Sequence, residues 1–174
     1  GNPDGTTGDI EGLQPFCDAY RGMEDTDHKN THLIRSQRPR KNLGQLHLRR
    51  FPEAEDLPIP TMRPFEGRTQ HVAVMRTPNL VVRYYPYLAN PIPSQGWVGV
   101  FKVLPEMDRE FARAEPPAHD AWSRDAATGP EGKRTNFPRI ALRNIKTVVA
   151  DFLSVDLAAS QGSGGSLGEL SETL

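Results

Sequence analysis

Three closely spaced runs of strand-forming residues constrain the fold of this chain most. The first, His71 to Met75, alternates along its length, and the second, Leu80 to Tyr87, is rich in β-branched and aromatic residues. A third run of the same character extends from Trp97 to Val103. Runs of this kind, bounded by Pro, Gly and Asn, predict β-strands. The folded core is therefore predicted to be organised around a sheet.

The spacing of these runs indicates how the strands connect. A three-residue turn, Thr77 to Asn79, separates the first two runs, which predicts an antiparallel hairpin. Upstream, Leu46 to Arg49 alternates and predicts another strand with one exposed face. Residues 51–68 carry prolines at positions 52, 58, 60 and 64, so this segment is predicted to cross the surface in an extended conformation.

The hydrophobic period becomes helical after the third run. Residues 104–114 begin with Pro and acidic residues and predict a short helix. A longer helix is predicted over Ile140 to Leu153, with Asn136 as its N-cap. We expect its apolar face to consist of Leu142, Ile145, Val149 and Phe152, packed against Val72, Val74, Val81, Val100 and Phe101.

These elements predict the α+β class: a small antiparallel β-sheet packed against a C-terminal amphipathic helix, with a long irregular N-terminal arm. The 174 residues suit one domain, and the many prolines and glycines indicate a small core with much irregular chain. We expect an irregular basic arm over 1–44, in which Phe16, Ala19 and Tyr20 could form one helical turn, and the α+β domain over 45–155. The glycine- and serine-rich segment 156–174 is predicted to be a disordered tail.

Basic residues gather in two stretches that contain no Asp or Glu, one over residues 28–52 and one over residues 132–149. On the predicted helix, positions 139, 143 and 146 form a stripe separate from the apolar face. The formal net charge of −1 leaves local clusters as the source of any electrostatic attraction. The predicted binding residues are Arg35, Arg38, Arg40, Lys41, Arg49, Arg50, Arg139, Arg143 and Lys146.

Clusters of this kind attract phosphate groups or acidic protein surfaces. No stacking aromatic residues are interleaved with them in the way that single-strand nucleic-acid binders require, so an acidic protein or neighbouring domain is favoured over nucleic acid as the partner. The leading hypothesis is a non-catalytic binding module. Gly1 in place of Met, and the linker composition of residues 1–9, indicate a piece of a larger bacterial-type protein, although a processed terminus or an expression remnant would look the same.

Two weaker clusters suggest chemistry. Asp25, Asp27, His28 and His32 are donors of the kind that zinc accepts, but their spacing is not specific, and a solvated loop is favoured. Glu115, His119 and Asp120 lie beside rigid prolines and near Trp122, and a His with a nearby carboxylate is the usual general-base pair of a hydrolytic enzyme. A structural turn is the favoured interpretation there. No phosphate-binding or dinucleotide motif accompanies either cluster, so no cofactor is predicted.

Cys17 is the only cysteine, which excludes an intramolecular disulfide and makes the reducing cytoplasm the expected compartment. No run of residues approaches the roughly 18 apolar residues that span a bilayer, so we expect no membrane contact.

Overall fold

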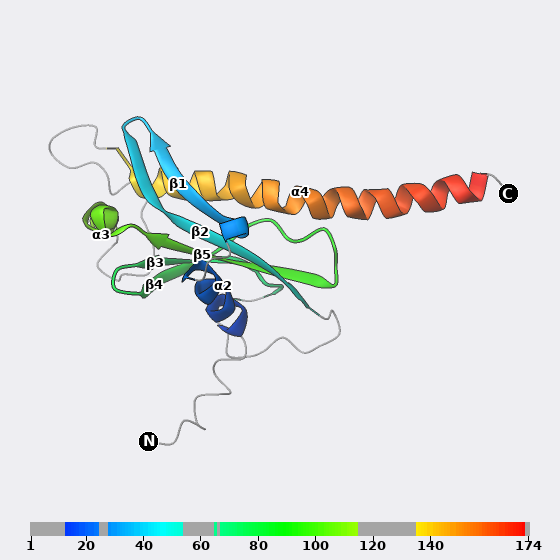
Figure 1. The fold of residues 1–174 in the computed structure, drawn as a ribbon, viewed down its shortest axis with the longest axis horizontal. Helices are drawn as coiled ribbons and strands as arrows, with labels where there is room; N and C mark the ends of the chain where they lie inside the picture. Colours follow the sequence, from blue (N-terminus) through cyan, green and yellow to red (C-terminus); the bar gives the residue numbers. More distant parts are fainter. Residues whose placement is uncertain (1–12, 25–27, 54–64, 66, 115–134, 173–174) are drawn as a thin grey trace, which may run out of the picture.

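A computed structural model of the chain describes residues 13–24, 28–53, 65, 67–114 and 135–172. Side chains of the last helix are described as far as Gly162. The elements are, in order, α2 (Gln14–Glu24), η3 (His28–Asn30), β1 (Thr31–Gln37), β2 (Arg40–Pro52), β3 (Gln70–Arg76), β4 (Leu80–Pro86), β5 (Gln95–Val103), η4 (Pro105–Met107), α3 (Asp108–Ala112) and α4 (Phe137–Glu172). A twisted sheet forms the centre, with α4 running across one side of it (Figure 1).

The sheet has five strands in the order β1-β2-β5-β3-β4. The predicted α+β class is confirmed, and β3 and β4 form the antiparallel hairpin that the turn at Thr77–Asn79 predicts. One pairing departs from the antiparallel expectation, because β5 lies parallel to β3. After β4, the chain crosses to the far side of β3 and enters the sheet between β2 and β3. There β5 runs antiparallel to β2 on one side and parallel to β3 on the other.

The alternation of side chains divides the core into two layers. Val72 and Val74 of β3 pack in the cluster that contains α4, whereas Ala73 and Met75 pack in the cluster that contains α2. Val81 and Val100, which were expected to meet the C-terminal helix, lie in the α2 layer instead. A one-residue error in assigning the face of a strand moves a side chain to the opposite side of the sheet.

The buried seam of α4 is also rotated from the predicted one. Ala141, Ile145, Val149 and Leu153 are almost fully buried at four-residue intervals, whereas Leu142 and Phe152 are half-buried at the edge of the seam. The predicted N-cap is confirmed, because the Asn136 side chain accepts a hydrogen bond of 3.0 Å from the backbone N–H of Arg139.

The N-terminal segment is more regular than the predicted irregular arm. Helix α2 buries Phe16, Ala19 and Met23 against the sheet, and β1 pairs along its whole length with β2. Strand β1 was missed because it buries only Ile34 and Ser36, and an irregularity after Ile34 interrupts the alternation. Pairing with β2 supplies the stability that its composition does not indicate.

Helix α4 continues to Glu172, whereas the sequence predicted a disordered tail from residue 156. Its C-terminal half extends beyond the edge of the sheet (Figure 1). Asp156 remains buried on the helix, while its neighbours Val155 and Leu157 are exposed. Within the described residues, no helix is long and apolar enough to cross a membrane.

Candidate functional site

A groove of about 700 Å³ lies between the N-terminal half of α4 and the chain at the end of β4. We call it the α4 groove. The residues that line it come from two segments far apart in the sequence: Tyr85, Pro86, Tyr87, Leu88, Arg139, Leu142, Arg143 and Lys146. One wall therefore consists of basic helix residues and the other of aromatic and apolar residues.

The groove exists because α4 covers only part of its face of the sheet. Helix α4 packs on β1 and β2, whereas β4 forms the opposite edge of the sheet. Tyr85 pairs across the strands with Val72, which belongs to the α4 layer, so the Tyr85 side chain lies on the same face as the helix. The side of α4 and the end of β4 thus become the two walls of the hollow.

The basic wall follows from the helical period. Arg139, Arg143 and Lys146 lie four and then three residues apart, which brings them to one side of α4. All three are exposed, and no Asp or Glu is among the described residues that line the groove. No ion pair to an acid is found for these three cations in the described part of the chain. Their positive charge is therefore available to a ligand.

The aromatic wall is held by hydrogen bonds. The hydroxyl of Tyr87 donates to the backbone oxygen of Leu142 at 3.3 Å, and its backbone N–H donates to the oxygen of Gln70 at 2.9 Å. Burial, and then the neighbouring Tyr85, raise the pKa of Tyr87 far above its usual value. Tyr87 therefore stays neutral and adds no negative charge to the groove.

Tyr85 lies on the same wall of the groove. Its ring is half-buried, and the guanidinium carbon of the exposed Arg83 lies 5.4 Å from the ring centroid. That arrangement is a cation–π contact, which helps to orient the ring. Sequence analysis missed both tyrosines as site residues, because they belong to a run that predicts a strand and lie more than fifty positions from the basic stripe. Only their aromatic character was available as a signal.

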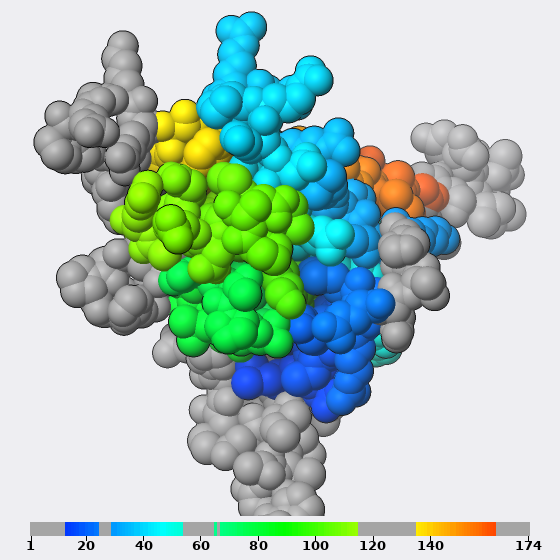
Figure 2. All heavy atoms as spheres, turned by 60° about the vertical axis from the view of Figure 1, so that its left-hand side comes forward, coloured from blue at the N-terminus to red at the C-terminus, as the bar shows by residue number. Residues whose placement is uncertain are grey.

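Four of the predicted basic residues form a second group around the tip of the β1–β2 hairpin. Arg35, Arg38, Arg40 and Lys41 are exposed there, and the hairpin projects beside the start of α4 (Figure 2). The side-chain amide of Asn144 donates to the backbone oxygen of Arg35 at 2.7 Å, which ties the hairpin to the helix. The hairpin thus contacts α4 through Asn144, outside the residues that line the α4 groove.

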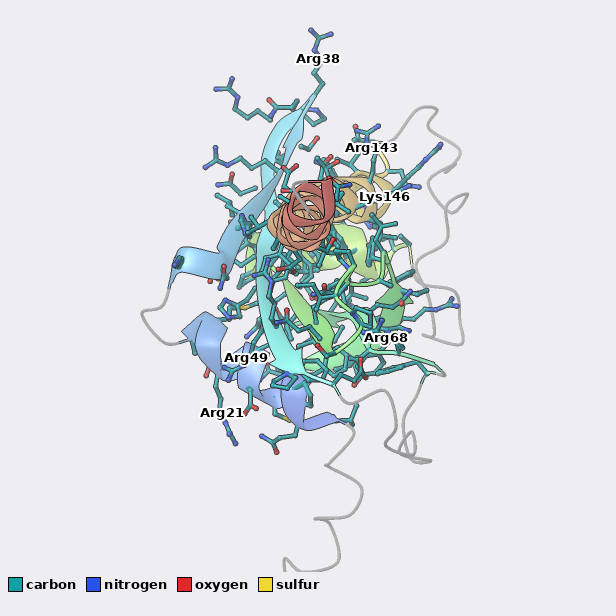
Figure 3. All side chains as sticks on the ribbon, turned by 90° about the vertical axis from the view of Figure 1, so that its right-hand side faces the viewer. Arg21, Arg38, Arg49, Arg68, Arg143 and Lys146 are labelled. Atoms are coloured by element: carbon teal, nitrogen blue, oxygen red, sulfur yellow. The ribbon has the colours of Figure 1, made fainter. Side chains whose placement is uncertain are left out.

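The two remaining basic candidates do not join these groups. Arg49 projects on the α2 side of the sheet together with Arg21, away from Arg143 and Lys146 (Figure 3). Arg50 forms an ion pair of 2.7 Å with Asp156 and covers the ring of Phe152. The charge of Arg50 is thus already paired inside the fold, and its predicted binding role stays a prediction.

The candidate metal and catalytic clusters fall largely outside the described residues. Asp25 and Asp27 are among the undescribed residues, as is the side chain of His28, while His32 is half-buried in β1. Glu115, His119 and Asp120 also lie outside the described part of the chain. No group of three or more His, Cys, Asp or Glu that could hold a metal occurs among the described residues. Both clusters remain predictions.

Comparison with protein-family models, with curated proteins and with solved structures finds no match to this chain.

Proposed function

We propose that this chain is a non-catalytic binding module that holds an anionic partner against the basic wall of the α4 groove. The observation that carries this proposal is the convergence of Arg139, Arg143 and Lys146 on a hollow whose described lining residues include no acid. Cations in a concave site attract anions more strongly than the same charges spread over a convex surface, because the walls focus the field.

The hairpin extends the same positive region. Arg38, Arg40 and Lys41 are exposed on the hairpin whose strand β1 packs beside α4, so a large anionic partner could contact both groups at once. An acidic protein or domain surface fits such a pattern and remains the partner that the sequence favours. Such a partner would place Asp and Glu side chains opposite the α4 cations.

Nucleic acid is a second candidate, and a specific observation favours it. The sequence counted against nucleic acid because stacking aromatic residues are not interleaved with the basic stretches in the way that single-strand binders require. Tyr85 and Tyr87 line the same groove as the α4 cations, so this objection no longer applies.

The proposal is tested by reversing charge. We would measure the binding of fluorescein-labelled polyglutamate and of a labelled oligothymidylate by fluorescence anisotropy at low and at high salt. The parent protein should bind at least one of these polyanions, and added salt should weaken binding because exposed ionic contacts are screened beyond a Debye length of about 10 Å at 0.1 M. Reversal of Arg139, Arg143 and Lys146 to Glu together should abolish the binding.

Two matched variants separate the groove from general charge. Arg49→Glu reverses one exposed cation on the α2 side and should leave binding nearly unchanged. Reversal of Arg38, Arg40 and Lys41 to Glu should weaken binding without abolishing it, since the groove cations remain. Binding that is insensitive to salt, or unaffected by the α4 triple reversal, would contradict the proposed function.

A further inference from the structure

We propose that the anionic partner of the α4 groove is a single-stranded nucleic acid, whose phosphates contact the α4 cations and one of whose bases stacks on Tyr85. This inference rests on the proposed function and specifies the ligand of the same site. It is carried by the way in which the groove divides into two chemically different walls.

The basic wall matches the spacing of a phosphate chain. Seven residues separate Arg139 from Lys146, so the three cations extend over roughly 10 Å of helix at a rise of 1.5 Å per residue. Measured along the axis of a duplex, successive phosphates of one DNA strand are separated by about 3.4 Å, and this separation is larger in an extended single strand. The wall can therefore contact the phosphates of two or three consecutive nucleotides.

The opposite wall offers the surface that bases require. Tyr85, Pro86, Tyr87 and Leu88 present aromatic and apolar groups to the groove, without a carboxylate among them. The hydroxyl of Tyr87 is bonded to Leu142, and the half-buried ring of Tyr85 lines the same wall, so we assign the stacking contact to Tyr85. Base stacking on an aromatic side chain contributes about 1–3 kcal/mol and tolerates any base.

The combination distinguishes a nucleic-acid strand from an acidic peptide. A single strand carries phosphates on one side and flat, weakly polar bases on the other, which corresponds to the two walls of the α4 groove. An acidic protein surface would use Arg139, Arg143 and Lys146 but would leave the aromatic wall without a matching group. A duplex would also match poorly, because its base faces are already stacked on one another.

The structure also supplies a rigid support for the stacking wall. The side-chain amide of Gln70 donates to the backbone oxygen of Tyr87 at 2.8 Å, and the indole N–H of Trp97 donates to the oxygen of Leu88 at the same distance. The wall is thus fixed before a ligand arrives, which reduces the entropy lost on binding.

The first test changes the protein. Binding of a fluorescein-labelled oligothymidylate and of labelled polyglutamate is measured for the parent, Tyr85→Ala and Tyr85→Phe, with circular dichroism melting as the check of folding. Tyr85→Ala should weaken oligothymidylate binding about 5- to 100-fold and leave polyglutamate binding unchanged, whereas Tyr85→Phe keeps the ring and should bind like the parent. Parent-like oligothymidylate binding by a folded Tyr85→Ala variant would overturn the inference.

The second test changes the ligand and needs no variant. An abasic oligomer of the same length keeps the phosphates and removes the bases, so it should bind the parent protein more weakly than oligothymidylate. Equal binding of the two oligomers would overturn the stacking role of Tyr85. Tighter binding of polyglutamate would also overturn it, and would identify an acidic protein surface as the partner.

Either result leaves the proposed function standing if the polyanions still bind through the α4 cations. If no polyanion binds, both the proposed function and this inference fail.

Discussion

The guanidinium of Arg50 on β2 and the carboxylate of Asp156 on α4 form an ion pair in which Nε and Oδ2 lie 2.7 Å apart. The side-chain amide of Asn90 donates to the same carboxylate oxygen at 3.0 Å, and the Arg50 guanidinium carbon lies 3.7 Å from the centroid of the Phe152 ring. This cluster fastens the middle of α4 to the sheet at the point where the helix leaves the core.

Asp156→Ala should therefore lower the free energy of unfolding by about 1–3 kcal/mol, because it leaves the partly buried Arg50 without its partner. The Asp156 side chain is only 10% exposed and that of Arg50 is 31% exposed, so the loss should exceed that of a surface pair. Asp151→Ala removes an exposed acid from the same helix and serves as the control. Urea denaturation checks both variants, and equal midpoints would mean that the Arg50 cluster does not stabilise the fold.

A second prediction concerns the two sides of α4. Val149 is fully buried, so Val149→Asp would bring an unpaired charge into the core and should cost several kcal/mol. Arg143 is exposed, and Arg143→Asp should cost under about 0.5 kcal/mol of stability although it changes the α4 groove. Denaturation midpoints of the two variants measure the difference. Similar losses would contradict the orientation of the helix.

The third prediction concerns the close contact of β5 with its neighbours. A Cβ added at Gly99 would lie 2.8 Å from a methyl carbon of Leu48 and 2.9 Å from one of Val72. Gly99→Ala should thus destabilise the protein by about 1–3 kcal/mol, because the centre of the sheet cannot easily move apart. Gly162→Ala is the control, since no heavy atom lies within 4 Å of its added Cβ and alanine favours a helix. Thermal unfolding should show opposite shifts, and a neutral Gly99→Ala would refute the tight contact.

Stability at high pH provides a fourth prediction. Burial, followed by the nearby Cys17, raises the pKa of Tyr84 above its usual value of 10.0, and burial raises that of Tyr87 as well. Because folding raises these two pKa values, the associated stability is fully present below pH 10 and is lost as the pH rises towards the folded-state values.

Ultraviolet absorbance of phenolate should show that some tyrosines of the native protein ionise at higher pH than in urea-unfolded protein, and Tyr87→Phe should reduce that difference. Urea midpoints should fall between neutral pH and about pH 11, and less so in Tyr87→Phe. Coincident titration curves for the native and unfolded chains would contradict the burial of these hydroxyls.

Elements whose formation depends on a repeat of apolar residues, or on a capping residue, could be predicted from the sequence alone. Strands β3, β4 and β5, the hairpin turn and the cap at Asn136 could all be predicted, because alternation, helical spacing and capping depend on residues a few positions apart. The basic stripe of α4 follows from the same helical spacing.

Features that depend on contacts between distant segments could be read from the folded chain alone. The parallel alignment of β3 and β5, and the formation of β1 by pairing, require partners that no local pattern specifies. The same holds for function. Arg50 resembled a surface cation until Asp156 was found beside it, and Tyr85 resembled an ordinary strand residue until α4 was found across the groove from it. Composition shows that a residue can bear charge or stack on a base, but its neighbours in space determine whether that group is used within the fold or remains available to a partner.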